Sequence, residues 1–201
     1  MMIGRIDEVD GHFVATKFVG LLVPTESMYF AHRNGRSTSS EASAGVRIQR
    51  DWRSIALGYG RVWLPVVALA LPIARACVGP VHATTWIVSA AFLGISLAAH
   101  RGGRLAEAEK AKLRLLGSVT GLRIDPERLR SSTRDVKRDS LGDLMEKGGI
   151  PMTPEGILSV LDDIPMPAMP LVYGYARYAG EDPAWRHCAE LVYQRYQQGD
   201  M

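Results

Sequence analysis

Hydrophobic positions are concentrated in one long stretch of the chain, from Ser54 to His100, which the uncharged turn Gly79-Pro80-Val81-His82 divides in half. The pattern predicts two membrane-crossing helices, over 54–78 and 84–99, because a span needs about 20 mainly apolar residues. Arg61 and Arg75 interrupt the first helix near its two ends. Long basic side chains at such depths extend to the headgroups, so both arginines are predicted to be membrane anchors.

Small residues recur at four-residue spacing within both predicted spans. They are Ala70 and Ala74 in the first, and Ala90, Gly94 and Ala98 in the second. Small side chains at this spacing allow two membrane helices to approach closely. We therefore expect this stripe to form the helix–helix contact, within the hairpin or with another copy.

The charges that flank the stretch predict its orientation. Arg53, beside the interfacial Trp52, precedes the first span, and Arg101 and Arg104 follow the second, whereas Arg75 is the one base at the edge of the connecting turn. Because positively charged flanks stay on the cytoplasmic side, both termini are predicted to be cytosolic. The expected location is a bacterial inner membrane, crossed twice.

Before the spans, residues 1–53 predict a small β-rich module. Runs rich in β-branched and aromatic residues predict strands over 12–19, 27–32 and 46–49, with a polar loop over 33–45. Asp51 is a candidate N-cap for the first span.

After the spans, residues 101–201 predict a helical domain. A helix over 105–119 could continue the second span, and another is expected from about Thr133 to Gly148-Gly149. A capping residue followed by proline marks a helix start at Asp125-Pro126, Thr153-Pro154 and Asp182-Pro183.

The end of this domain is expected to be a helical hairpin of 171–179 and 183–197. Tyr175, Tyr178, Trp185 and Tyr196 are its predicted packing residues, and together they form a possible partner surface.

Charge and cysteine content narrow the class of protein. The net charge is +3, but eleven bases against five acids lie between Arg101 and Arg138, just after the second span. This cluster suits anionic lipid headgroups. Nucleic acid is not expected as a partner, because no aromatic-interleaved basic patch accompanies the charge. The two cysteines, Cys77 and Cys188, would lie on opposite sides of the membrane, which argues against a disulfide.

Candidate catalytic and metal sites are weak. His12 and His32 fall on neighbouring predicted strands, and His187 adjoins Cys188, but no Cys-x-x-Cys or His-x-x-x-His spacing occurs. The pair Asp162-Asp163 is better explained as the polar end of a helix. Gly58-Tyr59-Gly60 lacks the third glycine of a nucleotide loop, and tight packing or a flexible membrane entry explains it better. We assign no catalytic, cofactor or metal residue.

A resemblance to known proteins begins with the segment Gly11-His-Phe-Val-Ala-Thr-Lys-Phe18. Pro24, Ser27 and Tyr29 follow this segment, and Asp51-Trp-Arg-Ser54 then leads into the apolar hairpin. This arrangement resembles a group of uncharacterised bacterial two-span membrane proteins in which a small β module precedes the spans. The resemblance covers roughly the first hundred residues. It implies the architecture and no catalytic residues.

The sequence thus predicts a membrane helical hairpin (54–100) between a small β-rich module (1–53) and a helical cytosolic domain (101–201). The leading hypothesis is a non-enzymatic adaptor or subunit of a membrane-associated assembly, with a protein partner or self-association. The alternative is an oligomeric transport component for a small solute or ion, with Arg75 and Gly94 lining the path. An enzyme acting on a lipid or peptide, through His100 and Glu107, is a third hypothesis.

Overall fold

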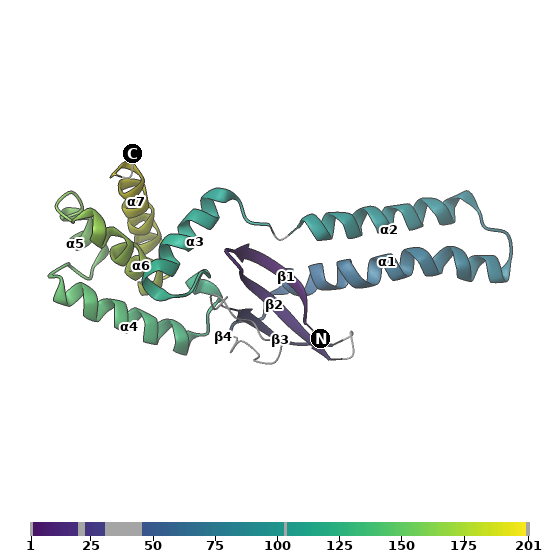
Figure 1. Cartoon of the computed structure of the whole chain (residues 1–201), viewed down its shortest axis with the longest axis horizontal. Coiled ribbons are helices and arrows are strands. Elements are labelled where there is room, and N and C mark those ends of the chain that lie inside the picture. The colour runs from purple at the N-terminus through teal and green to yellow at the C-terminus, as the bar shows by residue number, and fades with distance from the viewer. Residues whose placement is uncertain (1, 20–22, 31–45, 103, 200–201) are drawn as a thin grey trace. The chain divides into compact units, whose positions relative to one another are not determined.

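The computed structural model describes residues 2–19, 23–30, 46–102 and 104–199, and Figure 1 shows its elements. The chain divides into two compact units, Met1–Leu105 and Ala106–Met201. Each unit is described below by itself.

The first unit begins with an antiparallel sheet in the order β1-β2-β3-β4. Its strands are β1 (Met2–Val9), β2 (His12–Val19), β3 (Val23–Phe30) and β4 (Val46–Arg47). The predicted strand over 12–19 is confirmed, and β3 begins four residues earlier than predicted. β1 was not predicted, and the predicted loop over 33–45 lies outside the described residues.

The hairpin between β1 and β2 turns at Asp10 and Gly11. Both residues have positive φ, 47° and 83°, and Val9 pairs with His12 across the turn. Two consecutive residues of positive φ define the turn type whose twist matches that of paired strands. Asp7 also has positive φ, 54°, where the register of β1 against β2 shifts by one residue. The strand therefore bulges at this carboxylate.

The sheet packs on the first turns of α1 (Trp52–Val78), as Figure 1 shows. As predicted, Asp51 caps the helix, because its side chain accepts hydrogen bonds from the backbone N–H groups of Arg53 and Ser54. Behind the cap, the Thr16 hydroxyl donates to the Ser54 hydroxyl at 2.9 Å and lies 3.2 Å from the Ser27 hydroxyl. These three side chains are buried. This hydroxyl cluster fixes the sheet to the helix.

The second long helix, α2 (Ala83–Arg101), lies antiparallel beside α1, after the turn that the sequence predicted. Two helices that are long and apolar enough to cross a membrane are therefore present. The buried residues of α2 are Ser89, Ser96 and Ala99, and Ala68 is buried near the middle of α1. On α2 these positions are seven and three residues apart, which places them on one face of the helix.

The predicted small-residue stripe does not form this contact. Ala70, Ala74, Ala90 and Ala98 are exposed, and a Cβ built on Gly94 would meet no atom within 4 Å. A helix turns about 100° per residue, so the stripe and the pair Ser89 and Ser96 lie on different faces of α2. Since Ser89 and Ser96 face α1, the stripe points elsewhere. Close approach occurs instead at Gly60, where a Cβ would lie 3.0 Å from the Ala99 Cβ. Of the two explanations for Gly58-Tyr59-Gly60, tight packing is thus the one observed, at Gly60.

The second unit contains the remaining helices. They are α3 (Glu107–Thr120), η1 (Pro126–Arg128), α4 (Ser131–Lys147), α5 (Pro154–Ser159), η2 (Met166–Ala168), α6 (Met169–Ala179) and α7 (Pro183–Gly199). The predicted caps Thr153 and Asp182 are confirmed by side-chain hydrogen bonds to backbone N–H groups. Asp125 caps only a 3-10 turn. α3 does not continue α2, because the backbone is extended at Gly102.

The core of the second unit surrounds α6, which packs on α3, α4 and α7. Met145, Ile157, Met169, Val172 and Val192 are fully buried in it. The predicted hairpin of α6 and α7 is confirmed.

Aromatic rings stabilise this hairpin. Tyr173 and Tyr193 lie 5.6 Å apart, and Tyr175 meets Trp185 edge to face at 5.7 Å. Tyr175 and Tyr178 are therefore interior residues rather than a partner surface, since their rings fill the core of their own unit. Trp185 and Tyr196 are half-buried.

Candidate functional site

The outward surface of the α1–α2 hairpin is the most unusual feature of the first unit. Large apolar side chains point away from the protein along both helices, with Val78 81% exposed and Ile87 67% exposed. A core helix of a water-soluble protein would bury such side chains, whereas the most apolar windows of α1 and α2 are only 6% and 17% buried. Contiguous exposed apolar surface of this kind marks a membrane or protein contact.

Arg61 joins the two helices at the base of the hairpin. Its Nε donates to the Ala99 carbonyl at 2.9 Å, and one terminal nitrogen donates to the Gly102 carbonyl at 2.9 Å. These carbonyls belong to the end of α2, where a helix leaves its acceptors unpaired and its dipole favours a cation. The guanidinium of α1 therefore caps α2. Arg75, by contrast, is exposed near the far end of α1.

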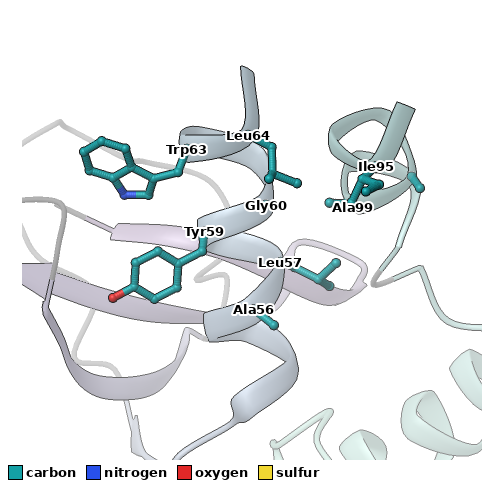
Figure 2. Close-up of a pocket in the computed structure, with 9 residues that line it drawn as sticks. Ala56, Leu57, Tyr59, Gly60, Trp63, Leu64, Ile95 and Ala99 are labelled. Atoms are coloured by element: carbon teal, nitrogen blue, oxygen red, sulfur yellow. The ribbon is translucent and has the colours of Figure 1, made fainter. Parts of the chain in front are cut away.

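An apolar groove of about 570 Å³ runs along the hairpin next to this cap. Figure 2 shows the rings of Tyr59 and Trp63 on one side of α1, and Leu57 and Leu64 on its other side, toward Ile95 and Ala99 of α2. Gly60 also lines the groove, at the point where the two helices approach each other closely. The remaining lining residues are Ala56 and Ala98. The lining of the groove does not include Ser54, whose hydroxyl accepts a hydrogen bond from Thr16 of the sheet, so the groove and the sheet contact are on different faces of α1.

Basic and aromatic residues flank the hairpin at the start of α1 and at the end of α2. Arg53, Arg101 and Arg104 are exposed. Trp52 is also exposed, and the guanidinium of Arg50 lies 5.5 Å from the centre of its ring. The structure therefore places the predicted interface residues Trp52, Arg53, Arg101 and Arg104 around the base of the hairpin, at the same end as the Arg61 cap.

The other described residues singled out from the sequence make contacts within their own units. The His12 ring bonds the Tyr29 hydroxyl at 2.7 Å, and His32 lies outside the described residues. The His100 ring bonds the Ser96 carbonyl of its own helix, and Glu107 pairs with Lys110 at 2.6 Å. Among the residues that the structure describes, no group of three or more metal-ligating side chains is found.

Cys188 is fully buried on α7. Burial raises the pKa of this thiol to about 11, with a smaller contribution from the charge of Glu155. A thiol with such a pKa stays protonated at neutral pH and is a poor nucleophile or metal ligand. His187 beside it is exposed.

No protein-family model, no curated protein and no solved structure matched the chain in the comparisons. The resemblance of the N-terminal segment to two-span membrane proteins is therefore still an expectation.

Sequence reasoning missed the Arg61 cap and the groove. Both depend on the register between α1 and α2, which brings Arg61 to a carbonyl 38 residues away. One signal was present: Gly60, Arg61 and Trp63 combine a small, a charged and an amphipathic side chain where the apolar stretch begins.

Proposed function

We propose that this chain is an integral protein of a bacterial inner membrane, with both termini in the cytosol. The supporting observation is the outward apolar surface of α1 and α2. Contact of this surface with water would be unfavourable, whereas lipid would cover it. The part of α1 beyond Arg61 is about 26 Å long and α2 is about 29 Å long. Both lengths are close to the roughly 30 Å of a hydrocarbon core.

In this proposal the cytosolic boundary lies near Arg61 rather than at Ser54. The first turns of α1 are occupied by the sheet through Ser54, Ile55 and Gly58. Arg61 caps α2 at that level, and Tyr59 and Trp63 provide the amphipathic rings that favour headgroup depth. The sheet would therefore lie against the cytosolic membrane surface.

We further propose that the protein is an adaptor or subunit of a membrane-associated assembly. The second unit offers exposed apolar side chains for a protein partner, namely Val136 and Leu144 on α4 and the nearby Met152. Val136 and Leu144 are eight residues apart, so they lie close to one helical face. These residues replace the tyrosines of α6 as the proposed contact, because the tyrosines are buried.

The membrane proposal is tested by alkaline extraction of cell membranes and by reporter fusions. Expected results are a protein that stays in the membrane pellet, an active cytosolic reporter after Met201, and an external reporter inserted between Pro80 and Val81. A protein that dissolves without detergent would contradict the proposal.

The adaptor proposal is tested by cross-linking in intact membranes followed by mass spectrometry. The expected result is a defined partner that is lost from the double variant Val136→Asp/Leu144→Asp and retained in Arg75→Ala. The transport alternative would be favoured if the cross-link were lost from Arg75→Ala and retained in the double variant, and if the protein were an oligomer in mild detergent. In that alternative, Arg75 and Gly94 face other copies.

A further inference from the structure

The groove beside Arg61 combines apolar walls with a basic end. Its lining from Ala56 to Leu64 on α1 and from Ile95 to Ala99 on α2 offers apolar and aromatic surface, with Tyr59 and Trp63 as one wall. A water-filled groove of this composition is unfavourable, whereas a hydrocarbon chain would gain contact with every wall.

Arg53 lies on α1 one helical turn before the residues that line the groove. It precedes Ala56 by three residues and Leu57 by four, so it lies on the same face of α1 as these two lining residues, one turn nearer to the start of the helix. Arg101 follows Ala98 by three residues on the other helix. Both side chains are exposed, and among the described residues no ion pair joins either to a carboxylate. Asp51 is the acidic residue nearest to Arg53 in sequence, and its Oδ1 accepts hydrogen bonds from the backbone N–H groups of Arg53 and Ser54.

We propose that this groove binds one anionic phospholipid, with an acyl chain along Tyr59, Trp63 and Ile95 and the phosphate beside Arg53 and Arg101. The proposal rests on membrane insertion of the hairpin, which places the groove at the cytosolic boundary. Charge complementarity selects the occupant, because a chain with a neutral head would leave the basic end without a counter-charge. An amphipathic ring at headgroup depth suits this position.

The test uses the full chain reconstituted in phosphatidylcholine vesicles and the fluorescence of Trp63. The chain contains four tryptophans, so a variant retaining only Trp63 reports on the groove. A variant retaining only Trp86, which is exposed on α2 outside the groove, is the matched control. Each is quenched with small fractions of acyl-brominated phosphatidylglycerol or acyl-brominated phosphatidylcholine.

The expected result is that brominated phosphatidylglycerol quenches Trp63 more effectively than brominated phosphatidylcholine by roughly fivefold or more, since one base beside an anionic headgroup contributes about that factor. Trp86 should be quenched equally by both lipids. Arg53→Gln should reduce the preference at Trp63 severalfold. Arg47→Gln should leave it unchanged, because Arg47 pairs with Glu26 on the sheet.

Substitutions that fill the groove with a larger side chain test whether it binds the acyl chain of the lipid. Ala98→Phe should abolish the preference at Trp63, whereas Ala90→Phe, an exposed position on the same helix outside the groove, should retain it. If Ala98→Phe fails to reconstitute, Ala56→Phe fills the α1 side instead.

Equal quenching of Trp63 by both lipids would overturn the lipid site while leaving membrane insertion intact. Quenching of neither tryptophan by either lipid would overturn insertion and the lipid site together.

Discussion

At the scale of single residues, Arg61 makes the contact that joins the ends of the two long helices. A guanidinium can donate to two carbonyls at once in a fixed fork, and here it reaches Ala99 and Gly102. A lysine could satisfy only part of this arrangement. The contact also explains how a charge can lie at the start of an apolar helix, since its hydrogen bonds are made within the protein.

We predict that Arg61→Gln weakens the hairpin by about 2 kcal/mol, the usual contribution of hydrogen bonds to a charged group. Arg61→Lys should recover part of this loss. The measurement is the free energy of unfolding of the full chain in mild detergent, from the circular dichroism of a denaturant titration. Arg75→Gln is the control and should have little effect, because Arg75 is exposed. Equal losses from both variants would contradict the capping role.

The buried thiol of Cys188 leads to a second prediction at this scale. Because burial raises its pKa to about 11, the thiol keeps its proton at pH 8 and is shielded from reagents. In a Cys77→Ser variant, we expect maleimide to leave the folded protein unmodified at pH 8. The same protein in sodium dodecyl sulfate should label fully, as read by intact mass. Rapid labelling of the folded protein would show that α7 does not cover the thiol.

At the scale of elements, the sequence predicted what local rules determine. The two long helices, the turn between them and the caps at Asp51, Thr153 and Asp182 all follow from neighbouring residues. β1 was missed because Met2–Val9 carries charged residues and a bulge at Asp7. The dipeptide Asp10-Gly11 between two hydrophobic runs was a usable hairpin signal.

Within the hairpin, the helix–helix contact is not made by the predicted small-residue stripe, because small size identifies residues that can pack and does not say which face does. A contact of that stripe with another copy stays a prediction. Ala90, Gly94 and Ala98 form one stripe of α2, and Ser89, Ser96 and Ala99 form another that is rotated around the helix. The observed register places the second stripe against α1. The Arg61 cap depends on the same register, so neither could be derived from spacing alone.

We predict that enlarging the observed packing face disrupts the hairpin and that enlarging the other stripe does not. Ser96→Leu should cost about 1–3 kcal/mol, because extra methylene groups overfill a close contact. Gly94→Leu should be tolerated within about 1 kcal/mol, the range of a helix-propensity change, since a side chain there meets open space. The free energy of unfolding in mild detergent measures both. If Gly94→Leu proved the more damaging, or broke an oligomer, the small stripe would be a contact between copies.

At the scale of the whole molecule, the two units differ in what their surfaces require. In the first, the apolar side chains of α1 and α2 point outward, and the sheet is built onto the same helix through Thr16, Ser27 and Ser54. A change in the tilt of α1 would therefore be transmitted to the sheet. In the second unit apolar side chains such as Met145 and Val172 are buried in a core, and its surface carries ion pairs such as Arg177–Asp125 at 2.7 Å and Lys112–Glu190 at 2.6 Å.

The second unit has its own core, so we predict that a fragment of residues 106–201 folds without detergent and unfolds cooperatively on heating. Its helices contribute Leu116, Met145, Ile157, Val172 and Val192 to one interior, and about a hundred residues suffice for an independent domain. Val172→Asp should abolish the transition in circular dichroism, because it places an unpaired charge among apolar side chains. Val136→Asp should preserve it, since Val136 is 69% exposed. A fragment without a cooperative transition would mean that this unit needs the first one, or the membrane, to fold.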